Sequence, residues 1–154
     1  RGKVLDVVLS ENTAVTVAGS HSMARTKSWR DDVRNGMQAL ILQNAGAFKG
    51  IWASFDGQAF VIDDLLLAQG MKKGDIPLVS IDGGQEAYRR IADPESMMTA
   101  TVAIPFEEMA IAAVDAMDKI AVQKQPRESV VSGPYLYRDP VLVDAHNVAD
   151  FLKK

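Results

Sequence analysis

The chain has 154 residues, of which 47% are hydrophobic and 24% are charged, and its formal net charge is −3. These values are ordinary for a globular protein that is long enough for one domain with its own core. The small negative charge gives no reason to expect binding to nucleic acid or to an anionic membrane surface. The sequence has no cysteine, which excludes disulfides and cysteine-ligated metals and leaves the cellular compartment open.

The opening of the sequence is unusual. Its first residues, RGKVLDVVLSEN, lack the apolar core of a signal peptide, and no run of about 18 apolar residues follows anywhere. The sequence also opens in the middle of a helical pattern and without Met. We therefore expect this chain to be a piece of a longer protein.

Helical and strand patterns alternate from the start. Residues 2–11 have helical spacing, and residues 14–18 (AVTVA) are typical of a strand. After a polar loop, Ser28 is placed to cap a second helix that ends at Gly46. A strand–helix–strand unit then follows, with its elements expected at 50–55, 58–69 and 77–81.

The second half continues the alternation. Pro94 and Pro105 mark the end of one helix and the first turn of another. The expected elements are a helix at 85–92, a strand at 99–104, a helix to about residue 122, extended pieces at 130–131, 135–137 and 141–143, and a final helix at 147–152. This order predicts an α/β fold, a three-layer parallel sheet with helices on both faces.

Two acids follow directly after neighbouring strands of the central unit. Asp56 comes after the first strand and Asp82 after the second. Ligands bind outside the carboxyl ends of the strands in an open parallel sheet, so this pair is the main functional clue. Aspartate at a turn also commonly caps the element that follows, and the sequence leaves this alternative open.

Other signs of chemistry are weak. His21 and His146 have no metal-ligand spacing, and no glycine-rich phosphate loop is present. We therefore expect no metal, no cofactor and no enzymatic activity. Trp29 opens a helix and Phe55 ends a strand, so either aromatic ring packs on the core or faces the apolar side of a sugar.

Several landmarks follow one another along the chain. They are Arg1-Gly2, Trp29 before a helix with a Leu/Ile cluster, GIWASFDGQA, PLVSIDGG, TATVAIPFEEMA and VLVDAHNVADFL. Together they resemble the C-terminal part of a type I periplasmic sugar-binding protein, of the ribose-binding class that serves ABC transporters. The resemblance covers essentially all 154 residues.

The resemblance implies a two-lobed protein that closes on a monosaccharide or polyol. Residues 1–104 and 130–154 would form the C-terminal lobe, and residues 105–129 a crossover helix that packs on a missing N-terminal lobe. Until that lobe covers it, the apolar face of this helix should be exposed. The implied partners are that lobe and a membrane permease. The implied location is periplasmic or exported, with a signal peptide in the missing part.

The resemblance also implies the ligand contacts. The matching residues are Arg1, Trp29, Phe55, Asp56 and Asp82, with Asp56 either touching ligand or holding the frame of the site. Phe55 replaces the asparagine that the family usually has, and Ile104 replaces a glutamine. Both changes remove hydrogen-bonding groups, so we expect a ligand other than ribose bound in the usual way.

Two other classes of protein share this element order. One is the effector-binding core of a LacI-type regulator, although the ending VDAHNVADF is closer to the transport proteins. The other is a phosphoacceptor receiver domain with Asp56 as acceptor. A receiver also needs acids after its first strand, where this sequence has Gly-Ser, and a lysine after its last, where it has Pro105.

Overall fold

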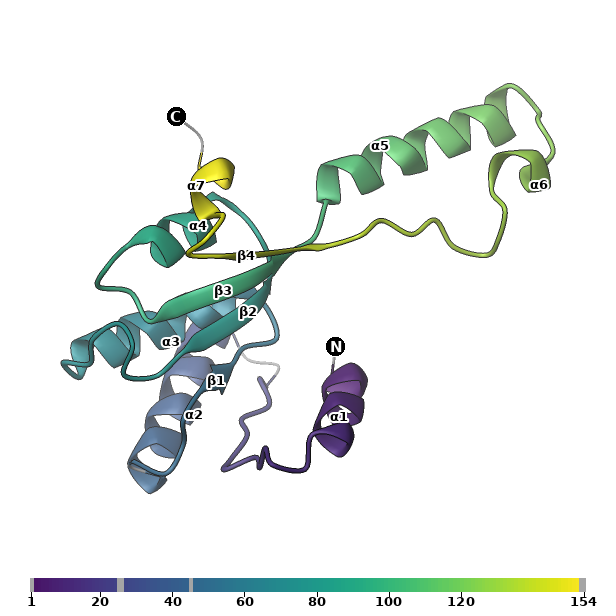
Figure 1. Cartoon of the computed structure of the whole chain (residues 1–154). Coiled ribbons are helices and arrows are strands. Elements are labelled where there is room, and N and C mark those ends of the chain that lie inside the picture. Colours follow the sequence, from purple (N-terminus) through teal and green to yellow (C-terminus); the bar gives the residue numbers. More distant parts are fainter. Residues whose placement is uncertain (1, 25–26, 45, 153–154) are drawn as a thin grey trace.

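A four-stranded sheet forms the centre of the computed structural model, which describes residues 2–24, 27–44 and 46–152 (Figure 1). The strand order is β1-β2-β3-β4. The strands are β1 (Ile51–Trp52), β2 (Leu78–Asp82), β3 (Met98–Ala103) and β4 (Val141–Asp144). The first three run parallel, as the sequence predicts, and β4 joins β3 antiparallel. The α/β fold is thus confirmed, with a mixed rather than an all-parallel sheet.

Helices cover both faces of this sheet, so the predicted three layers are present (Figure 1). One layer contains α2 (Trp29–Gln43) and α3 (Asp56–Ala68). The opposite layer contains α4 (Gln85–Ala92) and α7 (Val148–Phe151). The fully buried apolar side chains between the layers include Leu66, Leu78, Ile91, Met98 and Val143. Burial of such side chains is the main force that holds the layers together.

The start of α2 shows how local sequence sets an element boundary. Ser28 has extended backbone and accepts the Asp31 N–H on its hydroxyl at 3.3 Å. Asp31 and Asp32 lie in the first turn, where the helix dipole favours negative charge. The predicted cap is confirmed, and it places Trp29 at the first position of the helix.

A buried aspartate ties α3 to α4 and to the start of β3. Asp63 accepts hydrogen bonds from the Met97 N–H at 2.7 Å, the Ser96 hydroxyl at 2.8 Å and Arg90 at 2.8 Å. Burial alone would lower the pKa of Arg90, but its hydrogen bonds to Asp64, Asp63 and Glu86 outweigh burial and raise that pKa. Arg90 therefore stays charged beside a carboxylate that has no contact with water.

The prediction of a strand at 14–18 is wrong for this structure. Helix α1 (Gly2–Glu11) forms as expected, but it has no buried residue. The following residues form no regular secondary structure and join no sheet, with Val15 57% and Val17 61% exposed. A strand forms only when it can pair with the edge of another strand. Here a cavity separates residues 14–18 from β1, so they have no strand to pair with.

The long helix predicted after Pro105 projects from the sheet as an arm (Figure 1). It consists of α5 (Phe106–Met117), a π-helical turn η1 (Asp118–Val122) and α6 (Arg127–Val130), and an extended segment then returns to β4. Of the residues in α5, only Ala116 is buried, whereas Ile111 is 63% and Val114 70% exposed. The apolar surface expected on this helix is therefore exposed, and its cover by another lobe stays a prediction.

Candidate ligand-binding site

Asp56 lies at the carboxyl edge of the sheet, as the first residue of α3, and its side chain is only 6% exposed. One carboxylate oxygen, Oδ1, accepts hydrogen bonds from the Ser80 hydroxyl at 2.6 Å and the Thr101 hydroxyl at 2.7 Å. The other, Oδ2, accepts the backbone N–H of Gly83 at 2.8 Å. Both oxygens are thus occupied by groups on β2, on β3 and in the turn after β2.

The turn after β2 has an uncommon backbone conformation. Asp82 has φ of 139°, and Gly83 and Gly84 have φ of 80° and 156°. A Cβ on Gly83 would lie 2.6 Å from the Ala103 Cβ and 2.8 Å from the Tyr88 hydroxyl, so only glycine fits. A positive φ at a residue with a side chain is strained and is commonest at functional sites. This turn delivers the partly exposed Asp82 side chain to the sheet edge.

Trp29 and Phe55 meet at the same edge. Their ring centroids are 5.5 Å apart and their planes are tilted by 58°, a favourable arrangement for two aromatic rings. A Cβ on Gly57 would lie 2.9 Å from the Phe55 ring and 3.2 Å from the Trp29 ring, so the glycine lets the pair sit close to α3. Both side chains are partly exposed. The two predicted aromatics therefore form one platform.

Arg30 completes this platform in a way that sequence reasoning missed. Its guanidinium lies 4.4 Å from the centroid of the Trp29 ring, within the range of a cation–π contact. Its position next to Trp29 was the available signal, but residues one apart on a helix do not normally face each other.

Tyr88 is a second residue that the sequence did not single out. Its ring is buried on α4, packs 5.3 Å from the Phe151 ring and brings the hydroxyl to the Gly83 turn. Burial raises the pKa of Tyr88, and the charge of Asp56 raises it further. The hydroxyl therefore stays protonated, which suits a hydrogen-bonding role behind the turn.

The predicted site residues thus lie along one connected edge, with one exception. Phe55 and Asp56 are neighbours in the chain. Asp56 accepts a hydrogen bond from Gly83, in the turn that carries Asp82. The backbone N–H of Ile104 donates to the Asp82 carbonyl at 2.7 Å, so Ile104 borders the same turn. Arg1, the remaining predicted contact, lies outside the described residues.

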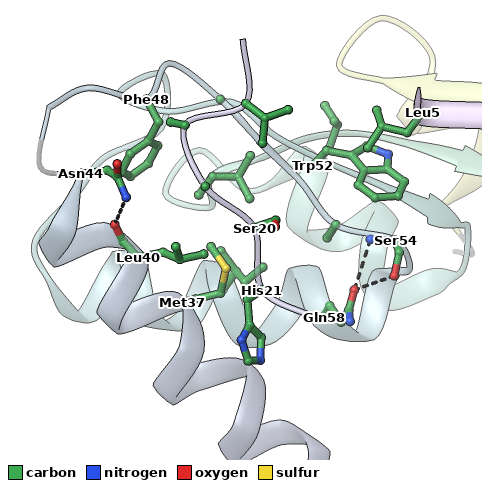
Figure 2. A pocket seen from close by; sticks show the side chains of 18 of the residues that line it. Leu5, Ser20, His21, Met37, Leu40, Asn44, Phe48, Trp52, Ser54 and Gln58 are labelled. Atoms are coloured by element: carbon green, nitrogen blue, oxygen red, sulfur yellow. Dashed lines mark hydrogen bonds between the residues drawn. The ribbon is translucent and has the colours of Figure 1, made fainter. Parts of the chain in front are cut away.

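A large cavity has a different position. It has a volume of about 1130 Å³ and lies among α1, residues 14–23, α2 and β1 (Figure 2). Phe55 reaches its rim, whereas Trp29 and Asp82 do not line it. Nearby, Gln58 accepts hydrogen bonds from the Ser54 N–H at 3.2 Å and the Ser54 hydroxyl at 2.8 Å. The candidate site is therefore an open edge and not an enclosed pocket.

Within residues 2–24, 27–44 and 46–152, no group of three or more His, Asp or Glu residues could hold a metal ion. No helix in these ranges is long and apolar enough to cross a membrane. Asp56 is also a poor phosphoacceptor, because a buried carboxylate that accepts three hydrogen bonds is not open to attack on phosphorus.

The fold of this chain is similar to that of several solved solute-binding proteins. A solute-binding protein of an ABC transporter from Agrobacterium vitis, solved with allitol, superposes with a TM-score of 0.75 at 21% identity; the match covers 96% of this chain and 49% of that one. The arabinose-transporter binding protein of Shewanella sp. ANA-3, bound to L-arabinofuranose, gives a TM-score of 0.77 at 19% identity, covering 95% and 45%.

A third solved structure is the Caulobacter myo-inositol-binding protein with myo-inositol, with a TM-score of 0.72 at 21% identity, covering 96% of this chain and 46% of that one. This chain therefore spans about half the length of the structures it matches. No protein-family model and no curated protein matches it. The periplasmic-binding-protein-like fold predicted from the sequence is confirmed. The three matched proteins were solved with allitol, arabinofuranose and myo-inositol.

Proposed function

We propose that this chain is the sugar- or polyol-binding lobe of the solute-binding component of an ABC transporter. The observation that carries the proposal is that an aromatic pair, Trp29 and Phe55, shares the carboxyl edge of the sheet with Asp82. The chain also resembles in fold proteins that were solved with allitol, myo-inositol and arabinofuranose, which supports the proposal. The ligand would bind there without a chemical reaction.

The two kinds of side chain suit the two kinds of surface on such a ligand. A sugar ring or a cyclic polyol has apolar faces, which the Trp29–Phe55 platform can cover. It also has a girdle of hydroxyl groups, which a carboxylate such as that of Asp82 accepts through charge-assisted hydrogen bonds. Arg1 is proposed as a second charged contact on the strength of its place in the sequence. Asp56 is proposed as the residue that holds the turn.

The ligand is proposed to differ from ribose bound in the usual way. Phe55 and Ile104 stand where the family usually has an asparagine and a glutamine, and neither can form a side-chain hydrogen bond. A site discriminates most strongly through the polar groups it pairs. A second aromatic face at Phe55 instead favours a ligand with a larger apolar face at this point.

The arm is proposed to be the contact with the second lobe, whose residues lie outside this chain. Its exposed apolar side chains include Phe106, Met109, Ile111, Val114 and Met117. A contiguous apolar surface of this kind commonly marks an interface. The complete protein would be exported, would close its two lobes on the ligand and would deliver it to a membrane permease.

An NMR titration of the complete protein tests this function. The probes are separate pools of pentoses, hexoses, deoxysugars and linear or cyclic polyols. We expect saturable shifts of the Trp29 indole and of the Gly83 and Gly84 amides with one pool. Trp52, the other tryptophan, lies on β1 outside the platform and provides the internal control. No shift at Trp29 or the turn with any pool would contradict the proposal, and a DNA-binding helix-turn-helix encoded upstream would favour a regulator instead.

A further inference from the structure

The last helix of the described residues, α7, is joined to the helix that begins directly after the Asp82 turn. Helices α4 and α7 lie side by side on one face of the sheet (Figure 1). The side chain of Gln85, the first residue of α4, donates a hydrogen bond to the Phe151 carbonyl at 2.8 Å. The Phe151 ring packs on Tyr88, with ring centroids 5.3 Å apart and planes tilted by 51°. Phe151 therefore holds the first turn of α4 through two separate contacts.

Tyr88 extends this support to the turn itself. Its side chain is buried, and a Cβ on Gly83 would lie 2.8 Å from its hydroxyl, so the hydroxyl fills the space that a side chain would need. Burial raises the pKa of Tyr88 and the charge of Asp56 raises it further, whereas a hydrogen bond with the Gly84 backbone acts in the opposite direction. The hydroxyl thus contacts both glycines that follow Asp82.

Helix α7 can act as a support because its own start is fixed to the sheet. The side chain of Asn147, the residue before α7, accepts the Asp144 N–H at 3.0 Å and donates to the Leu142 carbonyl at 2.9 Å. Both partners lie on β4, and Val148, the first residue of α7, is only 5% exposed. Since β4 pairs with β3, the support is anchored to the same strand that borders the turn.

The turn needs support because its backbone is strained. Asp82 has a φ of 139°, a value that residues with a side chain rarely adopt, and such strain persists only where surrounding contacts hold it. On the strand side, Asp56 accepts the Gly83 N–H at 2.8 Å, and the Ile104 N–H donates to the Asp82 carbonyl at 2.7 Å. On the helix side, Tyr88 supplies the corresponding contacts. The turn is therefore held between the sheet and α4.

We propose that Tyr88 and Phe151 are positioning residues of the candidate binding site. Phe151 holds Tyr88 in place, Tyr88 holds the two glycines, and the strained turn thereby keeps Asp82 at the sheet edge. Neither ring would touch a ligand, since Tyr88 is buried and Phe151 lies behind it on α7. A binding residue needs such supporting contacts because even a small displacement weakens a site.

The consequence for binding rests on the proposed function. A ligand that binds only one conformation of the turn has an apparent affinity reduced by the fraction of molecules in that conformation. If loss of the Phe151 ring leaves about one molecule in ten with the native turn, binding weakens about 10-fold. The support of the turn itself rests only on the contacts among α4, α7 and the turn.

Amide hydrogen exchange of the complete protein, without any sugar, tests this support. The readout is the exchange rate of the Gly83 amide, which is bonded to Asp56, divided by that of Val102, which pairs on both sides in β3. We expect Phe151→Ala to raise this ratio about 10-fold, because opening of the turn exposes Gly83 but not β3. A purely global loss of stability would speed both amides alike and leave the ratio constant.

Two further variants complete the comparison. Tyr88→Phe keeps the ring that packs on Phe151 and removes only the hydroxyl, so it should raise the ratio even if Phe151→Ala fails to fold. Ile91→Ala removes a buried side chain near the other end of α4, and it should lower the stability without raising the ratio. An unchanged ratio in Tyr88→Phe or in folded Phe151→Ala, or an equal rise in Ile91→Ala, would overturn the proposal.

The binding consequence is measured with the same pools of pentoses, hexoses, deoxysugars and polyols. With the pool that shifts the Trp29 indole, Phe151→Ala should need about 10-fold more for half-saturation, whereas Ile91→Ala should bind as the unchanged protein does. Equal affinity in Phe151→Ala would limit Tyr88 and Phe151 to a structural role and overturn their positioning role. If no pool shifts Trp29, the proposed function fails while the exchange result still stands, so the two proposals fail separately.

Discussion

The carboxylate of Asp56 accepts a hydrogen bond from the backbone N–H of Gly83 at 2.8 Å. This hydrogen bond links the end of β1 to the turn that follows β2. This bond joins the two positions at which the sequence places an acid after a strand. Because the same carboxylate also holds the hydroxyls of Ser80 and Thr101, one buried charge fixes the ends of three parallel strands relative to one another. The conformation of the Asp82 turn therefore depends on a residue that need not touch ligand.

Replacing Asp56 by Ala should destabilise the protein by about 3 kcal/mol, because two buried hydroxyls and one N–H lose their acceptor. Asp56→Asn keeps the shape and one acceptor oxygen, so its cost should be smaller. Urea unfolding gives the free energies, and the Gly83 amide shift reports the turn. If Asp56→Ala left both the stability and the Gly83 shift unchanged, the positioning role of Asp56 would be excluded.

Gly83→Ala should cost about 3 kcal/mol and distort the turn. The new methyl group would meet the Ala103 Cβ at 2.6 Å, and the residue would keep a φ of 80°, which disfavours a side chain. Gly133→Ala is the matched control, since a Cβ there meets nothing within 4 Å. Thermal unfolding of the two variants side by side measures the difference. Equal melting temperatures would show that the turn is not tightly packed.

Much of this fold follows from local pattern. Apolar runs at 50–55, 77–81 and 99–104 predict the strands seen as β1, β2 and β3, with boundaries that differ by a few residues. The direction of β4 does not follow from pattern, because it depends on how the chain returns from the arm. The strand expected at 14–18 failed for a similar reason. Strand pairing needs a neighbour, and the sequence pattern cannot show whether one is present.

The sequence predicts where the residues of the candidate site lie better than it predicts what each of them does. The rule that ligands bind at strand ends places Asp56 and Asp82 together, and the structure joins them. It could not show that Asp56 is turned inward, because its partners Ser80 and Thr101 are 24 and 45 residues away in the sequence. The Trp29–Phe55 contact is likewise a product of tertiary packing.

The hydrogen bonds from His21 and Ala24 to Asp32, which hold residues 21–24 against α2, should break at low pH. The pKa of Asp32 lies below its ordinary value of 3.8, first because it accepts the Ala24 N–H and then because it bonds to His21. A lowered pKa means that the charged form supports the fold above the ordinary value and that this support is lost as the pH falls through the lowered value. The Ala24 amide shift should therefore show an acid transition centred below pH 3.8.

Asp32→Asn gives the control for this pH effect. The amide cannot titrate, so the acid transition of the Ala24 shift should disappear in this variant. A transition that persisted in Asp32→Asn would assign the effect to another acid.

Asp63→Ala should destabilise the protein more than Asp64→Ala, the change at the neighbouring position of α3. Asp63 is fully buried and pairs with Arg90, so its loss leaves a guanidinium and two further donors short of a partner, at about 3–5 kcal/mol. Asp64→Ala removes an exposed carboxylate from the same guanidinium and should cost less than about 1 kcal/mol. Chemical denaturation of both variants tests the contrast. Similar losses would mean that burial does not govern this network.

Asp82→Ala in the complete protein should weaken binding of the ligand found by titration by about 100-fold or more, while the fold stays near native. The reason is that a carboxylate paired with ligand hydroxyls contributes charge-assisted hydrogen bonds that alanine cannot replace. Calorimetric titration measures the affinity, and the unfolding free energy measures the fold. Glu95→Ala removes an exposed acid at the opposite end of β3 and should change neither. Because the bond from Asp56 to Gly83 is retained in Asp82→Ala, an unchanged affinity would place the ligand elsewhere rather than indicate a disordered turn.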